Sequence, residues 1–254
     1  NKKFTFKKID ITNRSKIKNF LKKKKFDAVI HLAAQAGIRH SLTKPYDYVD
    51  SNLLGFSNIL EEIKNSKIKN FLFASSSSVY GEINRTPFSE KKSNTENPLQ
   101  IYAATKKSNE ILAKAYFNLY KIKIIGIRFF TLYGSYGRPD MAIFDFVKKI
   151  INRKSIHINN YGNHYRDFTH IDYASEVIFS LVVKTIKRKK SFFEIFNIGS
   201  SKPIKIMDLV SLLQNLLKMK AKIKFRRKQK GDAHGTFSDS KKILDFTKIK
   251  NKVR

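Results

Sequence analysis

The chain has 254 residues, of which 41% are apolar, and it carries a formal net charge of +32 at pH 7 and no cysteine. This size and apolar content suit one large α/β domain, or two tightly joined ones, with a sizeable core. The composition excludes disulfides, thiolate catalysis and cysteine-ligated metals, and it predicts a reducing compartment, the cytoplasm. No apolar run reaches the ~18 residues of a membrane span, and no signal-peptide pattern opens the chain.

The positive charge allows two interpretations. A basic surface could bind nucleic acid or an anionic membrane, or it could reflect a lysine-rich composition without such a partner. The lysines are spread over nearly the whole chain, which favours the second interpretation. Lysine and arginine clustered among exposed aromatic residues would favour the first. We therefore expect no nucleic-acid or membrane partner, although a basic surface would steer an anionic substrate toward the protein.

Short apolar runs alternate with amphipathic segments in the first half of the chain. Residues 26–32, 70–75 and 123–130 are β-rich runs of the kind that form buried parallel strands. Residues 46–64 and 103–119 carry apolar side chains at intervals of three and four, which predicts helices. Strands and helices in alternation predict a doubly wound parallel α/β sheet.

The later third of the chain has a different pattern. Residues 141–151 predict a helix after a break at Gly137 to Pro139 (GRP), and residues 192–198 predict a strand that Gly199 ends. Residues 203–217 predict an amphipathic helix. The densest basic stretch, residues 222–230, is expected to be a solvated loop or an edge strand.

A phosphate-binding motif is missing from the sequence. A doubly wound dinucleotide-binding fold normally opens with a strand, a Gly-rich turn and a helix whose N-terminus holds the phosphates. Neither G-x-G-x-x-G nor G-x-x-G-x-x-G occurs, and the first residue is Asn1. The simplest expectation is a fragment without its first strands and phosphate loop. Such a chain, expressed alone, is expected to be poorly soluble and to bind a dinucleotide weakly.

The most informative short motif is Tyr102-Ala-Ala-Thr-Lys106. Two residues four apart lie on the same face of a helix. A phenol is a poor base at pH 7 because its pKa is ~10, but a neighbouring ammonium group lowers that pKa. Alone, this spacing is weak evidence, because any lysine-rich helix can show it by chance.

A serine-rich turn follows the strand predicted over residues 70–75. The run from Ser75 to Gly81 (SSSSVYG) places hydroxyl side chains at the carboxyl end of a strand, where ligands bind in open α/β sheets. The alternative is an ordinary polar turn. Because the serines, the tyrosine and the lysine occur in this order and on these elements, a catalytic site is the stronger interpretation.

These residues and several further motifs resemble the extended short-chain dehydrogenase/reductases, in particular the NAD-dependent epimerase/dehydratase family. The resemblance covers essentially the whole chain. The further motifs are Asp10-Ile11, His31 to Arg39 (HLAAQAGIR), Asp50 to Asn52 (DSN), Arg128 to Gly134 (RFFTLYG), Tyr136 to Ala142 (YGRPDMA), Arg166 to Asp172 (RDFTHID), and Gly231-Asp232 followed by Ser238-Asp239.

The resemblance implies a domain organisation and a cofactor. It implies an NAD-binding Rossmann domain over residues 1–136, truncated at its N-terminus, and a smaller sugar-nucleotide-binding domain over residues 137–254. Parts of residues 157–198 are expected to return to the Rossmann sheet. The NAD contacts that it implies are Asp10, Ile11, Leu32, Ala33, Ala34, Gln35, Asn52, Ser75, Tyr102 and Lys106.

The resemblance also implies a mechanism with three catalytic residues. Tyr102, as a phenolate, removes the proton of the sugar 4-hydroxyl while the C4 hydride passes to NAD⁺. The 4-keto sugar then turns, and the hydride returns to its other face. Lys106 holds the nicotinamide ribose and lowers the pKa of Tyr102, and Ser76, four residues before Tyr80, hydrogen-bonds the sugar 4-oxygen.

The serine turn distinguishes reactions within the family. Its sugar 4,6-dehydratases carry Asp-Glu after the hydroxyl residue, and related decarboxylases carry a Glu in the same turn. Here those positions are Ser77 and Ser78, which cannot act as carboxylate acids or bases. The expected reaction is therefore a simple 4-epimerisation.

The residues after the RFF run bear on the sugar. UDP-glucose 4-epimerases usually have Asn where this chain has Thr131, whereas the family's UDP-glucuronate 4-epimerases, which the chain resembles most, have Thr. Hydroxyls and an arginine fork suit a C6 carboxylate, and Thr131, Arg138 and Arg39 are placed where the glucuronate enzymes supply them. Alternatively, Arg138 contacts only the diphosphate and Arg39 only caps a helix. The expected activity converts UDP-glucuronate to UDP-galacturonate. UDP-glucose or UDP-N-acetylglucosamine as the substrate, and a non-catalytic NAD-binding relative, stay open.

Three further expectations complete the site and its partners. The implied substrate contacts are Arg39, Ser77, Ser78, Thr131, Arg138, Met141, Ala142, Arg166 and Asp232, of which Arg166 is expected to grip phosphate bidentately. The histidines show no metal-ligand spacing, so no metal is expected, and His31 is expected in the core. The helices over residues 46–64 and 103–119 are expected to pair two protomers as a homodimer.

Overall fold

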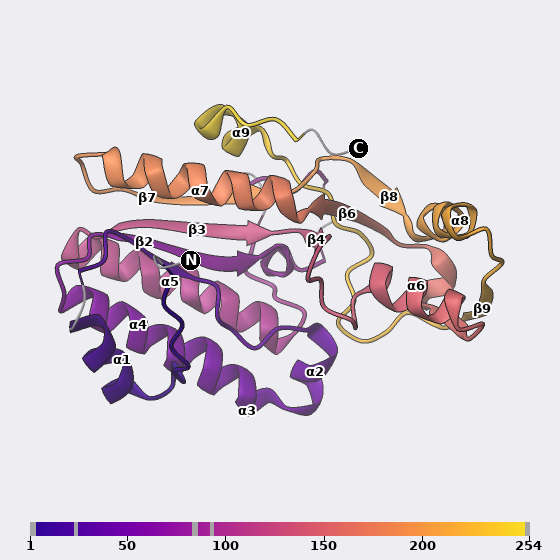
Figure 1. Cartoon of the computed structure of the whole chain (residues 1–254), viewed down its shortest axis with the longest axis horizontal. Coiled ribbons are helices and arrows are strands. Elements are labelled where there is room, and N and C mark those ends of the chain that lie inside the picture. Colours follow the sequence, from indigo (N-terminus) through magenta and orange to yellow (C-terminus); the bar gives the residue numbers. More distant parts are fainter. Residues whose placement is uncertain (1–3, 23–24, 83–85, 92–93, 252–254) are drawn as a thin grey trace. The chain divides into compact units, whose positions relative to one another are not determined.

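The computed structural model describes residues 4–22, 25–82, 86–91 and 94–251 (Figure 1). The chain forms two compact units, and each is assembled from three segments. The first unit comprises Asn1–Ser75, Gln100–Ile127 and Val182–Ile195, and the second comprises Ser76–Leu99, Arg128–Leu181 and Phe196–Arg254. The chain therefore passes between the units several times. The functional division predicted at residue 136 stays a prediction.

The first unit has an α/β architecture with a parallel pair of strands at one side of its sheet. The strands, in the order β1-β2-β3-β7, are Val29–His31, Asn70–Ser76, Lys123–Phe129 and Phe193–Ile198, and the ends of β2, β3 and β7 continue into the second unit. β1 and β2 run parallel, with Val29 opposite Phe71. The helices are α1 (Arg14–Lys22), α2 (Ile38–Thr43), α3 (Pro45–Tyr48), the π-helix η1 (Val49–Leu54), α4 (Gly55–Lys64) and α5 (Ile101–Tyr120).

Aromatic side chains hold α4 against the sheet of the first unit. The ring of Phe56 on α4 lies 5.9 Å from that of Phe71 and 5.2 Å from that of Phe73, both on β2. All three side chains are fully buried, and each such burial contributes ~1.5–3 kcal/mol. α5 packs beside α4 (Figure 1). The apolar core therefore fixes the helix that carries Tyr102 and Lys106.

Most of the elements predicted for the first unit are confirmed. The strands over residues 70–75 and 123–130 and the helix over residues 103–119 are present, with small shifts at their ends. The strand predicted over residues 26–32 is shorter than expected, because only Val29–His31 pairs with β2.

A π-helix interrupts the helix predicted over residues 46–64. That segment runs through α3, η1 and α4 in succession. The apolar spacing of three and four did not reveal η1, because a π turn adds a single residue to the helical repeat. The backbone therefore stays helical while the side chains after η1 are rotated relative to those before it.

The second unit contains two small sheets. In one, β4 (Thr131–Tyr133) lies parallel to β6 (Tyr165–His170), which pairs antiparallel with β8 (Pro203–Lys205). In the other, β5 (Ser155–Ile158) pairs parallel with β9 (Lys222–Phe225). The remaining elements are the 3-10 helices η2 (Ser77–Tyr80) and η3 (Asn159–Gly162) and the helices α6 (Ala142–Ile151), α7 (Ile171–Lys187), α8 (Ile206–Leu217) and α9 (Lys241–Thr247). α7 begins in the second unit and ends in the first.

One prediction for this unit needs correction. Residues 203–217 do not form a single helix, because Pro203–Lys205 is a strand and the helix begins at Ile206. The antiparallel partner β6 supplies pairing that sequence periodicity cannot show, with Ile204 opposite Arg166. Proline is tolerated there because it starts a strand at the sheet edge. The basic stretch after residue 222 begins as the edge strand β9, one of its two predicted forms.

In the part of the chain that the structure describes, no helix combines the length and the apolar character that a membrane crossing needs.

Candidate active site

Helix α5 buries a lysine cation in the first unit. Lys106 is only 3% exposed, and its Nζ donates a hydrogen bond to the backbone carbonyl of Ala74 on β2 at 2.8 Å. Burial disfavours the charged form and lowers the pKa of Lys106 to about 8. The ammonium group is therefore still mostly protonated at pH 7, but it releases its proton far more easily than a surface lysine does.

Tyr102 lies one helical turn before Lys106 on α5, and packing restrains its ring. The ring meets that of Tyr48 edge to face, with centroids 6.1 Å apart and planes at 78°. Tyr48 is fully buried, and its hydroxyl donates to the carbonyl of Gly37 at 2.5 Å. Aromatic edge-to-face contacts favour one ring orientation. Tyr102 and Lys106 therefore lie at the predicted helical spacing on α5, and the Tyr48 contact restrains the Tyr102 ring.

The π-helix η1 positions Asn52 to join two parts of the first unit. Asn52 Oδ1 accepts from the backbone N–H of Gln35 at 2.8 Å, and its Nδ2 donates to the carbonyl of Gln35 at 3.0 Å and to Thr105 Oγ1 at 3.1 Å. Thr105 Oγ1 in turn donates to the carbonyl of Tyr102 at 2.9 Å. Both amide hydrogens of Asn52 are thus used within the protein. The residue links the turn after β1 to the Tyr102–Lys106 segment, a role that the sequence did not reveal.

His31 is buried in the first unit, as expected. Its ring packs against those of Phe56 and Phe71, with centroid distances of 5.5 and 6.4 Å. Burial, and secondarily the positive charge of Lys106, lower the pKa of His31 to about 4. The imidazole is therefore neutral at physiological pH and adds no second cation beside Lys106.

The other predicted cofactor residues of the first unit lie in two turns. Leu32 and Ala33 are exposed directly after β1, at the strand end where ligands bind in such sheets. Asp10 is exposed, and its carboxylate accepts from the backbone N–H of Thr12 at 2.9 Å and from Thr12 Oγ1 at 2.8 Å. These hydrogen bonds, the backbone one first, lower the pKa of Asp10.

Two residues that the sequence analysis missed hold the turn at Asp10. Asn58 Nδ2 donates to the carbonyls of Ile11 and Thr12, both at 3.0 Å. A side chain on Gly55 would meet Ile11 at 2.6 Å, so glycine allows α4 to approach the turn. The only available signal was the helical spacing that places Gly55 and Asn58 on one face of α4.

The serine turn belongs partly to each unit. Ser75 lies in the first unit and donates from Oγ to Glu110 Oε1 at 2.6 Å. Ser76 begins the second unit, and its Oγ accepts from the backbone N–H of Ser78 at 3.2 Å and from Ser78 Oγ at 2.9 Å. The second unit thus brings Ser76 and Ser78 together, and Ser77 lies between them at the start of η2.

Tyr80, the last residue of η2, is a structural residue. Its hydroxyl donates to Asn197 Oδ1 at 2.8 Å, and the guanidinium of Arg128 lies 4.7 Å from its ring centroid. Burial raises the pKa of Tyr80 to about 12. A phenol with that pKa stays protonated, so Tyr80 cannot act as a base near neutral pH.

The two predicted arginine contacts of the second unit are engaged within the protein. Arg166 donates from Nη1 to the carbonyls of Tyr165 and His234 at 2.8 and 3.2 Å, and from Nη2 to that of Ala233 at 3.1 Å. Arg166 therefore fastens the segment after the predicted contact Asp232 onto β6.

Arg138 is exposed and forms a bidentate pair with Asp140, with Nε–Oδ1 at 2.9 Å and Nη2–Oδ2 at 2.5 Å. Three other predicted substrate residues, Thr131, Met141 and Ala142, are half-buried at or near the starts of β4 and α6. Arg39 lies in α2, and its side chain falls outside the part of the structure that is described.

Asp167 is the buried centre of the second unit and was not predicted. It is fully buried and accepts from the backbone N–H groups of Ser200, Ser201 and Ser238 at 2.6, 3.1 and 3.0 Å. The hydroxyls of Ser200 and Ser238 also donate to it, at 2.7 and 2.5 Å. A side chain on Gly199 would clash with the hydroxyl of Ser238. The carboxylate thereby ties β6 to two segments that lie far along the chain.

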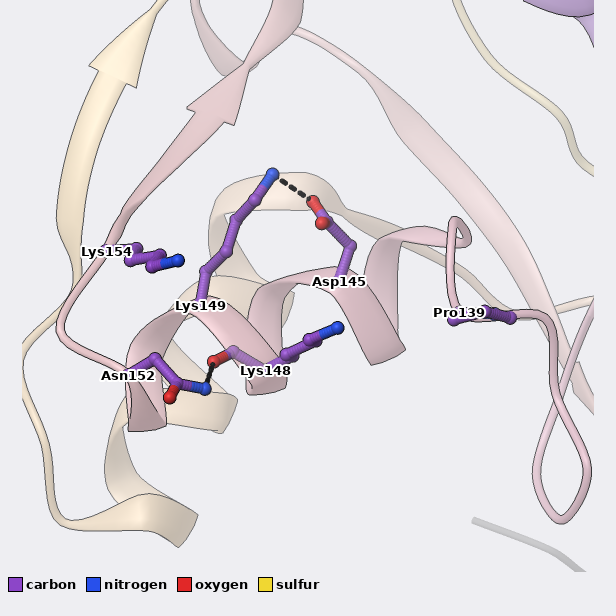
Figure 2. A pocket seen from close by; sticks show the side chains of 6 residues that line it. All are labelled: Pro139, Asp145, Lys148, Lys149, Asn152 and Lys154. Carbon is purple, nitrogen blue, oxygen red and sulfur yellow. Dashed lines mark hydrogen bonds and ion pairs between the residues drawn. The ribbon is translucent and has the colours of Figure 1, made fainter.

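A pocket of about 280 Å³ lies elsewhere in the second unit, beside α6 (Figure 2). It is lined by Pro139, Asp145, Lys148, Lys149, Asn152 and Lys154. Lysines near the C-terminal end of a helix are stabilised by the helix dipole, and Lys149 is paired with Asp145 at 2.7 Å. None of the predicted site residues lines this pocket, so we do not assign the chemistry to it. Among the described residues, no group of histidine and acidic side chains could hold a metal ion.

Comparison with known proteins decides the family. Residues 1–199 match the NAD dependent epimerase/dehydratase family. The chain belongs to this family. An uncharacterized protein from Methanocaldococcus jannaschii is 46% identical over 246 residues, which are 96% of this chain and 74% of that protein. A UDP-glucuronate 4-epimerase from Thermodesulfobacterium geofontis is 41% identical over 248 residues, again 96% of this chain and 74% of the relative.

A solved structure agrees with this family membership. The crystal structure of UDP-glucuronic acid 4-epimerase from Bacillus cereus, in complex with UDP-glucuronic acid and NAD, superposes with a TM-score of 0.90 at 31% sequence identity. The alignment covers 100% of this chain and 78% of that chain. The similarity confirms the predicted α/β fold.

NAD is the cofactor of the family, and the first unit has groups that fit it. The exposed Leu32 and Ala33 can pack on a ring, and the exposed carboxylate of Asp10 can accept from an N–H or O–H donor. Lys106 adds a buried cation on the neighbouring helix. This set of apolar, acidic and basic groups suits a dinucleotide with both aromatic and hydroxyl parts.

Proposed function

We propose that the chain is an NAD-dependent 4-epimerase of a UDP-sugar and that its substrate is UDP-glucuronate, which it converts to UDP-galacturonate. The observation that carries the proposal is the burial of Lys106 one helical turn after Tyr102. Relatives named UDP-glucuronate 4-epimerase, at 42% and 41% identity, support the choice of reaction.

Tyr102 is the proposed base. As a phenolate it takes the proton of the sugar 4-hydroxyl and later returns a proton to the 4-oxygen, so the protein ends the cycle in its starting protonation state. Lys106 favours the phenolate because a neighbouring positive charge stabilises the anion. NAD, when bound, accepts and returns the hydride at C4.

Ser76 is the proposed hydrogen-bond donor to the sugar 4-oxygen. Its own oxygen accepts from the N–H and the hydroxyl of Ser78. Two donors on that oxygen orient the remaining Ser76 proton away from them, so it can serve an outside acceptor. Because the following residues are Ser77 and Ser78 and not carboxylates, the turn supports proton transfer at C4 without loss of water.

The proposed contacts to the C6 carboxylate are Thr131 and Arg138. A guanidinium and a hydroxyl can bind a carboxylate with charge-assisted hydrogen bonds. Arg138 is paired with Asp140, so the substrate carboxylate would have to replace that partner. This exchange gives a reason for the enzyme to distinguish UDP-glucuronate from UDP-glucose, which carries no charge at C6.

We propose further that two chains associate through α5 and the helical segment before β2. Ile111 and Leu119 of α5 are 60% and 69% exposed, and Leu54 of η1 is 49% exposed. Apolar side chains at this exposure are better covered by a symmetric partner than by water. The same proposal assigns NAD binding to residues 1–136 and binding of the sugar nucleotide to residues 137–254.

The function is tested by proton NMR of the sugar nucleotide. The 254 residues contain no Gly-rich phosphate motif, so the assay uses the chain both alone and preceded by the phosphate-loop segment of a family member. Incubation with NAD⁺ and UDP-glucuronate should produce UDP-galacturonate, and Tyr102→Phe should lower the rate by about 10²–10⁴-fold. Tyr161→Phe, at a 63% exposed tyrosine, is the matched control and should keep the rate.

Two other outcomes of the assay would change the proposed substrate or contradict the proposed catalytic function. Turnover of UDP-glucose or UDP-N-acetylglucosamine in place of UDP-glucuronate would keep the mechanism and change the substrate. Absence of turnover on all three by a folded, NAD-binding protein would leave a non-catalytic NAD-binding relative as the better description.

A further inference from the structure

A buried glutamate lies on the helix that carries Tyr102 and Lys106. Glu110 is 5% exposed, and its Oε1 accepts a hydrogen bond from Ser75 Oγ at 2.6 Å. Its Oε2 lies 3.9 Å from Nζ of Lys107. A buried carboxylate is costly without hydrogen bonds, so this contact is one that the fold has to maintain.

The contact joins α5 to the end of β2. Tyr102, Lys106 and Glu110 follow one another at intervals of four on one face of α5. Lys106 donates to the carbonyl of Ala74, and Glu110 accepts from the hydroxyl of the next residue, Ser75. The helix is therefore bonded at two successive turns to two successive residues of β2, immediately before Ser76.

Two such contacts fix the helix in a way that apolar packing does not. Apolar side chains tolerate small sliding movements, whereas a hydrogen bond of 2.6 Å is lost when its partners separate by an ångström or more. In enzymes, a displacement of ~1 Å at a catalytic group can lower the rate by about 10²-fold. A contact that stops α5 from sliding along β2 therefore acts on Lys106 and Tyr102 without touching the substrate.

We propose that Glu110 is a positioning residue, which fixes α5 along β2 through Ser75 and so holds the Lys106 ammonium group on the carbonyl of Ala74. The turnover part of this inference rests on the proposed function. The placement of Lys106 does not, and it can be measured in the absence of any sugar.

The test separates the reach of Glu110 from its charge. Glu110→Gln keeps the length of the side chain and an oxygen that can accept from Ser75, but it removes the charge. Glu110→Asp keeps the charge and is about 1.5 Å shorter, which breaks the contact. Glu61→Asp is the matched control, because Glu61 accepts from the hydroxyl of Tyr116, near the far end of α5, at 2.8 Å.

The first readout is the titration of Lys106, followed by NMR of ¹³C-labelled lysine and assigned by its loss in Lys106→Arg. The unchanged chain, Glu110→Gln and Glu61→Asp should titrate with a midpoint near 8. In Glu110→Asp the midpoint should move toward the ~10.4 of a solvated lysine, because water reaches the amine. A midpoint that stays near 8 in Glu110→Asp would overturn the inference, whether or not any UDP-sugar is turned over.

The second readout is the kcat and KM of sugar turnover. Glu110→Asp should lower kcat by about 10–100-fold with KM within about threefold, while Glu110→Gln stays within about threefold on both. Equal losses in the two variants, accompanied by equal losses of thermal stability, would assign Glu110 to folding alone and contradict a positioning role. If the chain preceded by the phosphate-loop segment folds and binds NAD but turns over no UDP-sugar, the proposed function fails, and the Lys106 titration still decides the inference.

Discussion

The two units use buried charged groups in opposite ways. In the first unit, Lys106 is buried and donates to the backbone carbonyl of Ala74, and burial lowers its pKa to about 8. In the second, Asp167 is buried among three backbone N–H groups and two hydroxyls. A buried cation with few hydrogen-bond partners releases its proton easily. A buried carboxylate that accepts many hydrogen bonds instead holds chain segments in place. Lys106 is thus suited to proton chemistry, whereas Asp167 serves as scaffolding.

The largest expected effect on stability is at the scaffolding residue. Asp167→Ala should lower the free energy of unfolding by about 3–5 kcal/mol, because the N–H groups of Ser200, Ser201 and Ser238 lose their buried acceptor. Urea denaturation measures this change. Asp172→Ala, at a side chain that is 80% exposed, is the control and should stay within about 0.5 kcal/mol. A loss below about 1 kcal/mol at Asp167 would show that the serines find other partners.

The next effect concerns the pH dependence of the first unit. The pKa of Lys106 is about 8 in the folded chain, against 10.5 for an ordinary lysine, so the unfolded chain binds more protons between these values. Stability should therefore rise with pH over that interval, by up to roughly 3 kcal/mol from this residue. Urea denaturation at pH 7.5 to 10.5 should show the rise in the unchanged chain relative to Lys106→Met. Parallel curves for the two proteins would mean that Lys106 is solvated.

A smaller effect is expected at the π-helix. Asn52→Leu should destabilise the first unit by about 1–3 kcal/mol, because the N–H and C=O of Gln35 lose their partners. Asn52→Asp keeps the acceptor for the N–H of Gln35 but loses both donated hydrogen bonds, so it should fall between Leu and the natural residue. Hydrogen exchange at the Gln35 amide checks the local origin of the loss. Unchanged protection of that amide in Asn52→Leu would contradict the proposed link.

The smallest effect on stability is expected at the exposed pair of the second unit. Arg138 and Asp140 have side chains 45% and 64% exposed, so Arg138→Ala should change the free energy of unfolding by no more than about 1 kcal/mol. Its effect on substrate should be larger, with a KM for UDP-glucuronate raised about tenfold or more because a charge-assisted contact is lost. The KM for UDP-glucose in the same variant is the control. Equal changes for both sugars would remove Arg138 from the recognition of the C6 carboxylate.

The sequence predicted the elements of the first unit better than those of the second. Residues 70–75, 103–119 and 123–130 have strong periodicity and long apolar runs, and the structure confirms them. The strand Pro203–Lys205 was missed because its pairing with β6 depends on residues almost forty positions earlier in the chain. Periodicity reports which face of a segment is buried, but it does not report which segment covers that face.

The sequence by itself determined the α/β class, the family, and the Tyr102 and Lys106 pair at helical spacing, because these depend on residue types within a few turns of one another. Only the tertiary structure decided that Asp167 holds three serines, that Asn52 links Gln35 to Thr105, and that Glu110 meets Ser75. Each of these contacts joins residues from 17 to 71 positions apart. Burial and hydrogen bonding depend on which residues lie close together in space, and local sequence patterns do not show which distant segments meet.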